Sequence, residues 1–555
     1  MTEQFYQQII ETLKRKNIPK EDMTRFKIDL CKQFKVKKIP TDIQILMHAK
    51  QEDLKDLKLV TKPTRTISGV ATVALMTKPF ACPHGKCTFC PGGPQSYYGD
   101  VPQSYTGKEP STMRGIRNDY DSYLETFNRL EQYIATGHVP EKIEIIVQGG
   151  TFLSMPLDYQ NDFITFAFKA MNDFSQLFFP NNDFDLDKFK KFFELPTEIR
   201  DEERTIRLKQ KMYEIRGSSN LELEKQRNQT SKIRCVGLTI ETKPDWGKLD
   251  EGNRMLDFGC TRVELGVQSV YDKQLKITNR GHDIKDTIES IKILKDLGFK
   301  INAHYMPGLP EINYEQDLKG MKQLFSDPDF KPDMLKIYPC MVAPGTPLYE
   351  QYKKGKFVPL STEDAAKMLA EFKPFIPTYC RVQRVQRDVP TKQWAAGVGM
   401  TNFRQYTFEK YKPKCRCIRC REPMKKQVDL ENVQLLVQEY EASQGKEFFI
   451  SFENIEQDII LGFCRLRFPS HFLRQEITQT SALIRELHVY GTATAIGQEG
   501  KVQHKGFGKK LLEKAEQISK ENKKDKIVII SGVGVREYYA KLNYKLEGPY
   551  MVKKL

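Results

Sequence analysis

The chain has 555 residues, with 88 Lys and Arg against 72 Asp and Glu, which gives a formal net charge of +16. This length predicts three or four domains at roughly 150 residues each, and the hydrophobic fraction of 39% excludes a mainly disordered protein. No apolar run approaches the ~18 residues that span a bilayer, and the polar N-terminus carries no secretion signal. We therefore expect a cytoplasmic protein without a membrane segment.

Residues 1–66 form the first predicted unit, a small helical module. Apolar residues recur three to four positions apart, as in Phe5, Ile9 and Leu13, which is the period of an amphipathic helix. Basic residues lie between them, so the module is a candidate for binding nucleic acid phosphates.

Residues 67–395 alternate strand-like runs with amphipathic stretches of helix length, which predicts an α/β unit with a parallel sheet or barrel. The predicted strands are Val70–Leu75, Ile143–Val147, Cys235–Ile240, Arg262–Val267, Lys300–Tyr305 and Leu335–Tyr338. The predicted helices are Asp119–Ile134, Asp158–Met171, Asp283–Leu297 and Tyr314–Phe325. Residues 174–232 interrupt this alternation with a Phe-rich and then a charged stretch, and we interpret them as an insertion of surface helices.

Two further units follow. Residues 396–427 are a short, basic, Cys-rich linker, and residues 428–555 show the pattern of a separate α+β domain. The strands predicted in this domain are Phe448–Phe452, Ile459–Arg467, Ala482–Tyr490 and Lys526–Ser531, and the helices are Gly508–Lys520 and Arg536–Leu542.

The twelve cysteines favour metal ligands or buried thiols over disulfides, because nothing directs the chain to secretion. Six of them are isolated in the sequence and are expected in the core: Cys31, Cys235, Cys260, Cys340, Cys380 and Cys464. The other six form two clusters.

The first cluster, Cys82, Cys87 and Cys90, has the spacing C-x4-C-x2-C on the loop after the first predicted strand of the βα repeat. Three thiolates at this spacing can hold three irons of a [4Fe-4S] cluster and leave the fourth iron open for a small chelating ligand. The alternative is a zinc site with His84 as the fourth ligand.

This loop resembles the radical S-adenosylmethionine (SAM) superfamily, although the usual spacing there is C-x3-C-x2-C. Further motifs narrow the resemblance to the Elongator catalytic subunit (elongator protein 3) family: Gln103–Pro110, Gln148–Phe152, Glu241–Asp245, Glu264–Ser269, Asn279–His282, Leu335–Pro339 and Arg384–Asp388. The resemblance covers Pro79 to Leu555. It implies a partial (β/α)6 barrel, a [4Fe-4S] cluster that binds SAM, Gly149 and Gly150 near SAM, tRNA as substrate and other Elongator subunits as partners.

In the C-terminal domain, Gln503-His-Lys-Gly506-Phe-Gly508 follows a strand and opens a helix. Glycines there let backbone N–H groups approach a pyrophosphate at a helix N-terminus. The order of elements resembles the GNAT acyl-CoA-dependent acetyltransferases. That resemblance implies acetyl-CoA contacts at Glu486, Leu487, His488, Val489, Gly506, Phe507, Gly508, Tyr538 and Lys142.

Two residues of this set are also the predicted catalytic residues, Tyr538 and Lys142. A tyrosine at position 538 could protonate a leaving CoA thiolate as a general acid. Core packing is the alternative for Tyr538, and a simple exposed charge is the alternative for Lys142.

The second cluster, Cys415, Cys417 and Cys420, has the spacing C-x-C-x2-C among many basic residues. Three such thiolates suit a structural zinc ion that needs one more ligand, and free thiols in a linker are the alternative. The surrounding positive charge predicts contact with nucleic acid, which agrees with tRNA as the family's substrate.

The resemblance implies a complete reaction. SAM reduced at the cluster would give a 5′-deoxyadenosyl radical, which would abstract hydrogen from the methyl group of acetyl-CoA, and the carbon radical would add to C5 of uridine 34 in tRNA. Thioester hydrolysis would leave a carboxymethyl group. The alternative function is a protein lysine acetyltransferase in which the barrel is only a structural platform.

Overall fold

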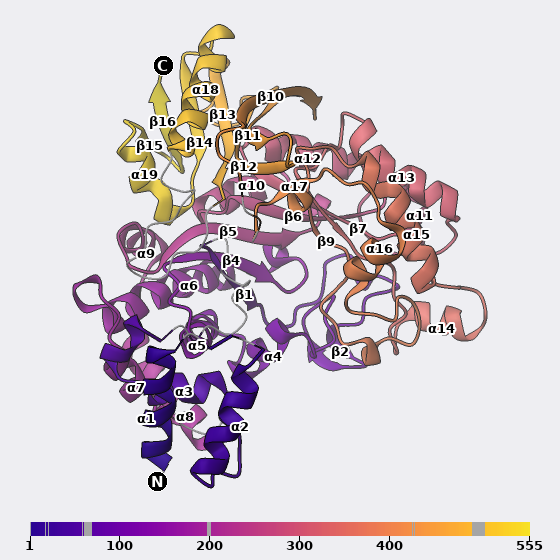
Figure 1. Cartoon of the computed structure of the whole chain (residues 1–555). Coiled ribbons are helices and arrows are strands. Elements are labelled where there is room, and N and C mark those ends of the chain that lie inside the picture. The colour runs from indigo at the N-terminus through magenta and orange to yellow at the C-terminus, as the bar shows by residue number, and fades with distance from the viewer. Residues whose placement is uncertain are drawn as a thin grey trace.

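The structure is a computed structural model that describes the chain except for residues 1, 17, 20, 58, 60–68, 197–200, 425, 427 and 491–505. Its helices are α1 (Thr2–Arg15), α2 (Met23–Gln33), α3 (Asp42–His48), α4 (Pro110–Arg117), α5 (Ser122–Ala135), α6 (Leu157–Phe178), α7 (Leu186–Phe192), α8 (Glu202–Arg216), α9 (Leu221–Asn228), α10 (Leu249–Asp257), α11 (Asp272–Ile277), α12 (Ile284–Asp296), α13 (Tyr314–Ser326), α14 (Pro347–Lys353), α15 (Thr362–Phe372), α16 (Phe403–Tyr411), α17 (Ile418–Arg421), α18 (Phe507–Glu521) and α19 (Arg536–Ala540) (Figure 1). Its strands are β1 (Ala71–Met76), β2 (Gly93–Ser96), β3 (Gly99–Val101), β4 (Lys142–Gln148), β5 (Arg234–Thr242), β6 (Arg262–Gln268), β7 (Lys300–Tyr305), β8 (Met334–Ile337), β9 (Arg381–Arg384), β10 (Val433–Ala442), β11 (Gly445–Asn454), β12 (Ile459–Phe468), β13 (Ser481–Val489), β14 (Lys526–Ile530), β15 (Lys545–Glu547) and β16 (Tyr550–Lys554).

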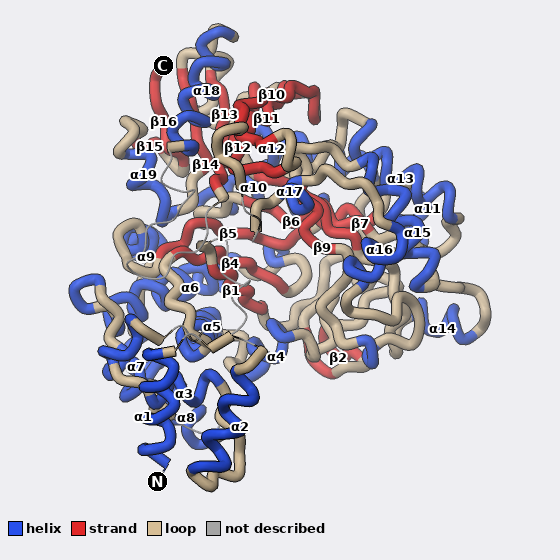
Figure 2. Tube along the Cα trace, viewed as in Figure 1, coloured by secondary structure: helices blue, strands red, loops and turns tan. Residues whose placement is uncertain are grey.

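The first sheet is a half-barrel of seven parallel strands in the order β1-β4-β5-β6-β7-β8-β9 (Figure 2). The predicted α/β fold with a partial barrel is confirmed, and β9 adds a strand beyond the six predicted. In β4, the alternating apolar residues Ile143, Ile145 and Val147 are buried on one face. Ile146 and Gln148 point the other way, into the barrel.

The insertion differs from its prediction. Helix α6 continues without a break to Phe178, so the helical segment begins before residue 174 and not at it. The phenylalanines are buried together and are not on the surface, because Phe174, Phe178, Phe189 and Phe193 pack ring against ring between α6 and the segment that contains α7. Charged helices α8 and α9 follow, as expected.

The N-terminal module is helical, as predicted, and has its own small core around Phe5, Ile9 and Ile45. It lies next to the insertion, at the end of the molecule away from the C-terminal domain (Figure 1). Its predicted boundary at residue 66 falls outside the described residues. No helix of the described chain is long and apolar enough to cross a membrane.

The C-terminal domain is a second seven-stranded sheet, in the order β10-β11-β12-β13-β14-β16-β15, with α18 packed on it. Strands β10 to β13 are antiparallel, and β13 and β14 are parallel. The parallel pairing ends at Ile484 and Ile529, whereas β13 continues to Val489. Strand β14 itself ends at Ile530, so among the described strands one edge of β13 has no partner from Arg485 onward.

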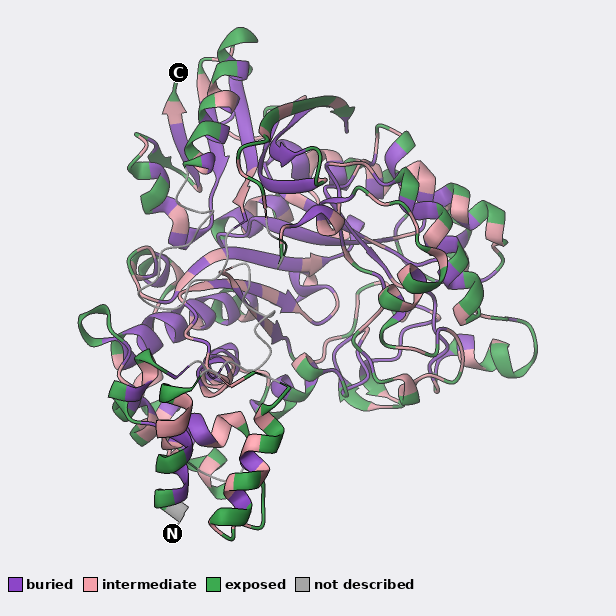
Figure 3. Cartoon of the chain, in the orientation of Figure 1, coloured by how far each residue is buried: buried purple, intermediate pink, exposed green. Residues whose placement is uncertain are grey.

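Buried ion pairs fasten this domain to the barrel. Arg485 on β13 donates to both oxygens of Asp333, at 2.6 and 2.8 Å, and Arg467 on β12 donates to Asp296 at 2.6 Å. All four side chains are fully buried. Most of the strand residues in both sheets are buried as well (Figure 3). Because the pairs join α12 and the start of β8 to the second sheet, the two domains have a fixed relative position.

Candidate functional site

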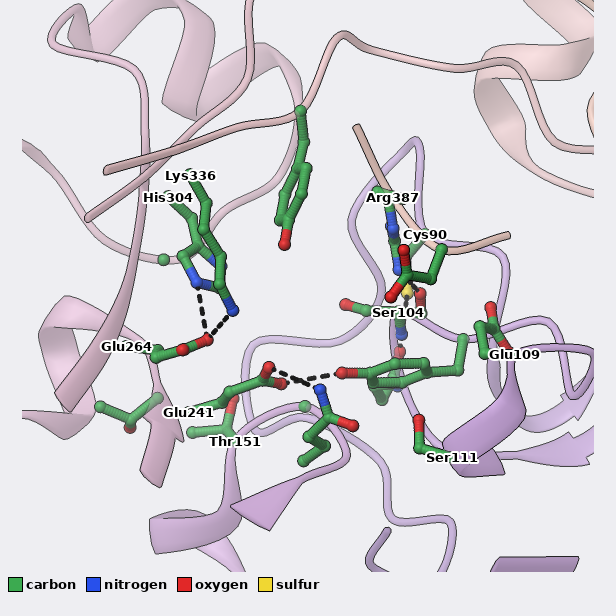
Figure 4. Close-up of a pocket in the computed structure, with 18 of the residues that line it drawn as sticks. Cys90, Ser104, Glu109, Ser111, Thr151, Glu241, Glu264, His304, Lys336 and Arg387 are labelled. Carbon is green, nitrogen blue, oxygen red and sulfur yellow. Dashed lines mark hydrogen bonds and ion pairs between the residues drawn. The ribbon is translucent and has the colours of Figure 1, made fainter. Parts of the chain in front are cut away.

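A cavity of about 420 Å³ opens at the carboxyl ends of the barrel strands (Figure 4). The loop after β1 brings Cys82, Cys87 and Cys90 to its wall, as the sequence predicted. Gly150, at the end of β4, also lines it. The other lining residues that matter below are Gln103, Tyr105, Gln148, Glu241, Lys243, Glu264, Gln268, Arg280, His304, Lys336, Arg384 and Arg387.

Each of the three sulfur atoms has a polar neighbour. The Ser104 N–H donates to Cys90 Sγ at 3.2 Å, an Arg280 N–H donates to Cys87 Sγ at 3.3 Å, and Thr151 Oγ1 lies 3.8 Å from Cys82 Sγ. Hydrogen bonds to sulfur are typical of iron–sulfur sites, where they tune the reduction potential. The donors and the cavity beside the thiols thus fit a [4Fe-4S] cluster with an open iron.

A zinc ion fits this loop poorly. Tetrahedral zinc with Zn–S bonds of about 2.3 Å brings thiolates within roughly 4 Å of one another. Among the described residues, three sulfurs within 4.8 Å of one another occur at Cys415, Cys417 and Cys420, and not at the first cluster.

Both ring nitrogens of His84 make hydrogen bonds in this loop. Burial first, and then the charges of Lys243 and Arg280, lower its pKa to about 4, so the ring is neutral. Lys243 Nζ lies 2.9 Å from Nδ1, which must accept that hydrogen bond. Nε2 therefore carries the proton and donates to Cys87 Sγ at 3.3 Å.

Gly149 and Gly150 are required by the packing around the cavity. Both have positive φ, of 131° and 96°. A Cβ on Gly149 would lie 1.9 Å from Thr77 Oγ1, and a Cβ on Gly150 would lie 2.8 Å from Gln103 Cβ. The two glycines thus form a tight turn after β4, which brings Gly150 into the cavity wall.

The floor of the cavity carries a buried charge cluster that sequence reasoning did not place in the site. Glu264 on β6 pairs with Lys336 on β8 and lies 3.1 Å from His304 Nε2 on β7. Burial alone would raise the pKa of Glu264, but Lys336 and His304 hold it well below its usual value. The motifs containing these residues were visible in the sequence, but the contact across three strands was not.

Three residues of the predicted acetyl-CoA set lie together at the start of α18: Val489, Gly508 and Tyr538. A Cβ on Gly508, in the first turn of α18, would lie 3.0 Å from the Tyr538 hydroxyl and 3.6 Å from Val489. Tyr538 is 40% exposed, and burial raises its pKa. Gly506 is the left-handed N-cap of α18, while Gln503 lies outside the described residues.

Three side chains of the predicted set point away from this group. Phe507 packs on Phe452 in the core, with ring centroids 4.7 Å apart. Glu486 is bound by Arg465 at 2.8 Å. Leu487 packs against the same core as Phe507. These residues can offer a ligand only their main chain, since their side chains are committed to packing or to an ion pair.

His488 and Lys142 lie near this region without touching Tyr538. His488 lies beside Tyr490, with ring centroids 4.5 Å apart, and burial lowers its pKa to about 4. Lys142 begins β4 opposite Arg234 of β5. Gly534, four residues before Tyr538, packs on Arg234, where a Cβ would lie 2.5 Å from the Arg234 Cβ.

The second cysteine cluster is compact. Besides the sulfur spacing given above, Lys373 Nζ lies 3.7 Å from Cys415 Sγ, and an Arg404 N–H donates to Cys420 Sγ at 3.3 Å. Cationic donors favour thiolates, which are the form that binds metal. Within the described chain, no His, Cys or carboxylate joins the three as a fourth ligand. The six isolated cysteines are all buried, as predicted.

Comparison with known proteins agrees with this geometry. Residues 2–67 match the ELP3 N-terminal domain, residues 78–322 the radical SAM superfamily, and residues 332–412 the radical SAM C-terminal domain. A protein of Methanocaldococcus infernus named tRNA uridine(34) acetyltransferase is 42% identical over 93% of this chain and 92% of its own. The chain belongs to the elongator protein 3 family. Elongator complex protein 3 of Saccharomyces cerevisiae is 38% identical over 94% of this chain and 90% of its own.

A solved elongator protein 3 structure supports the fold. The archaeal M. infernus Elp3 with residues 1–46 deleted is 39% identical, has a TM-score of 0.71, and covers 88% of this chain and all of its own. The family relationship also reaches further than the motifs indicated, because the match at residues 2–67 includes the N-terminal module.

A substitution at Gly508 tests the predicted acetyl-CoA site at the start of α18. In the Gly508→Ala variant, the new methyl group meets the Tyr538 hydroxyl at about 3.0 Å and should displace it. We expect acetyl-CoA affinity, measured by isothermal titration calorimetry, to fall roughly tenfold, which is about 1.4 kcal/mol. Gly399→Ala is the matched control, because its nearest neighbour there, Thr362 Oγ1, is 4.0 Å away. Equal acetyl-CoA affinity in the two variants would show that Gly508 does not line the acetyl-CoA site.

Proposed function

We propose that this chain is a radical SAM acyltransferase that modifies C5 of the wobble uridine, U34, of tRNA with the acetyl group of acetyl-CoA. The observation that carries the proposal is the cavity in which three cysteines, each with a polar neighbour at its sulfur, lie at the open end of a parallel half-barrel. The relatives named tRNA uridine(34) acetyltransferase, at 42% identity, supply the substrate class.

Cys82, Cys87 and Cys90 would hold a [4Fe-4S] cluster, and Gly150 would leave room beside it for SAM. When bound, these groups supply a 5′-deoxyadenosyl radical. The chain's own contribution is electrostatic. Arg280 and the neutral His84 donate to the sulfur of Cys87.

The edge of β13 that extends beyond β14, unpaired among the described strands, supports a GNAT-like acetyl-CoA site together with the start of α18. The left-handed Gly506 opens α18, whose N-terminal N–H groups would receive the pyrophosphate. Val489, Gly508 and Tyr538 would surround the thioester end. The Tyr538 hydroxyl is protonated at neutral pH, as for any tyrosine with a pKa of about 10 or above, and would deliver its proton to the CoA sulfur. Lys142 would help to hold the same ligand, since it pairs with Arg234, on which Gly534 packs.

Cys415, Cys417 and Cys420 would bind a structural zinc ion. We expect about one zinc per chain by mass spectrometry of the metal, and loss of zinc in Cys417→Ser. A chelator that removes the metal should lower the melting temperature, because the ion orders a linker with little core of its own. Full stability in metal-free protein would support free thiols in place of zinc.

The experiment that tests the function uses anaerobically reconstituted full-length protein. Acetyl-CoA hydrolysis and 5′-deoxyadenosine release are measured with tRNA that carries U34, with tRNA that carries C34, and without tRNA. The proposal expects both products only with the U34 tRNA. Acetyl transfer to a lysine peptide, unaffected by tRNA or SAM, would support the alternative of a protein acetyltransferase on a structural barrel.

A further inference from the structure

The cavity is lined by both hydrogen-bond acceptors and cationic side chains. Hydrogen-bond acceptors lie on β4, β5 and β6, in the side chains of Gln148, Glu241 and Gln268. Cationic donors lie on β8 and on β9 and its following loop, in Lys336, Arg384 and Arg387 (Figure 4). Such a cavity suits a flat polar ligand that presents an N–H on one side and oxygen acceptors on others.

Glu241 is the acceptor that is held most firmly. The Tyr105 hydroxyl donates to its Oε2 at 2.9 Å, and the Gln148 amide N–H donates to its Oε1 at 3.2 Å. Burial, and then the charge of Glu241, raise the pKa of Tyr105 well above its usual value, so the hydroxyl stays a donor. Each carboxylate oxygen keeps a further lone pair for a ligand.

Two acceptors beside Glu241 have no partner. Oε1 of Gln148 and Oε1 of Gln268 are buried and make no hydrogen bond within the described structure. Buried polar atoms are normally satisfied, so unsatisfied acceptors in a cavity wall indicate that a donor belongs there. Arg387 adds a guanidinium group at the same place, 5.9 Å from the ring centroid of Tyr105, and such planes stack on unpaired bases.

We propose that Glu241 accepts the N3–H of the target uracil and thereby selects uridine over cytidine. The inference rests on the proposed function. Uracil carries a proton at N3 between two carbonyl oxygens, whereas N3 of cytosine is an acceptor that a carboxylate repels. Modification at C5 fixes how the ring is turned in the cavity, so the base cannot rotate to offer another edge. Tyr105 and Gln148 are positioning residues that hold the carboxylate.

The test removes the proposed hydrogen bond by changing either the RNA base or Glu241. Anticodon stem-loop RNAs with uridine, 3-methyluridine or cytidine at position 34 are titrated against the full chain, and binding is followed by fluorescence anisotropy. The wild-type chain should bind the uridine RNA roughly tenfold to hundredfold more tightly than the other two. In Glu241→Ala, the preference for uridine over 3-methyluridine should disappear, because neither RNA can then donate a hydrogen bond to residue 241.

The variants are chosen so that each result is informative. Glu241→Gln keeps the side-chain size, which guards against misfolding of the alanine variant. It keeps one acceptor oxygen, so its preference over 3-methyluridine should shrink, and its amide N–H can donate to N3 of cytosine, so its preference over cytidine should shrink further. Tyr105→Phe should reduce the preference without removing it. Glu311→Ala is the matched control, since Glu311 is exposed and pairs only with Lys273 on the surface in the described structure. It should keep the wild-type preference.

Other results would overturn the inference. A preference retained in both Glu241 variants would do so. A Glu241 variant that loses SAM affinity but keeps the uridine preference would also overturn it, because Glu241 would then bind the cofactor and not the base. Wild-type protein that binds none of the RNAs would instead remove the proposed function, whereas wild-type binding without any preference for N3–H would remove this inference alone.

Discussion

We expect the Cys87→Ser variant to lose its iron–sulfur cluster and all 5′-deoxyadenosine formation. Cys87 is buried, lines the cavity and receives hydrogen bonds from both Arg280 and His84. With two thiolates left, the loop cannot hold three irons of the cluster. Iron content, the visible absorbance of the reconstituted protein and 5′-deoxyadenosine release should all fall to the level of a blank.

The control for this experiment is Cys340→Ser. Cys340 is buried in the same apolar cluster as Cys87 and Cys90 but lies outside the cavity wall. It should keep both the absorbance and the product. If Cys87→Ser still assembles a cluster with full absorbance, the assignment of ligands to this loop is wrong.

The second large effect concerns stability. Asp333→Asn removes the charge that faces Arg485, and Arg465 Nη1 lies 3.6 Å away from the same carboxylate. Breaking a buried ion pair on one side typically costs about 3–5 kcal/mol, because the remaining charge stays buried. The melting temperature and the urea midpoint should both fall clearly. Asp388→Asn, which breaks an exposed pair with Arg384, should change the stability by at most about 1 kcal/mol.

The pH dependence gives a second check on Asp333. Burial alone would raise the pKa of this carboxyl, but Arg485 and then Arg465 hold it far below its usual value. A depressed pKa contributes stability above the unfolded value of about 4 and loses it only as the pH falls through the folded value. The difference between wild type and Asp333→Asn should therefore be constant from about pH 6 to about pH 8. A difference that grows across this window would point to another group.

The local sequence pattern was sufficient to predict most strands of the barrel, but not the strand at its edge. The six predicted strands are all present, because each is a continuous apolar or alternating run. Strand β9 has four residues and a polar sequence, so only its pairing with β8 makes it a strand. The helix expected at Asp119–Ile134 begins instead at Ser122, where Asp121 caps it, and α4 precedes it. In the C-terminal domain, β10, β15 and β16 were not predicted.

The residues of the candidate site likewise fall into two groups, those in local motifs and those that only the fold brings together. Spacing and glycines located the cysteine loop and the start of α18, because these motifs are local. The pairs Glu264–Lys336 and Tyr105–Glu241 join residues 72 and 136 positions apart, so they depend on how the strands and loops come together. The resemblance implies an acetyl-CoA contact at Phe507, and the helix turns the side chain of this residue into the core.

The contact between the N-terminal module and the insertion bears on which relatives contain these two segments. Gln51 donates to the Phe184 carbonyl at 2.6 Å and accepts from the Leu186 N–H at 2.7 Å, while Lys190 donates to the Ala49 carbonyl at 2.9 Å. Each segment thus satisfies main-chain groups of the other. Loss of one would leave polar groups of the other without partners, so we expect relatives to gain or lose the two segments together.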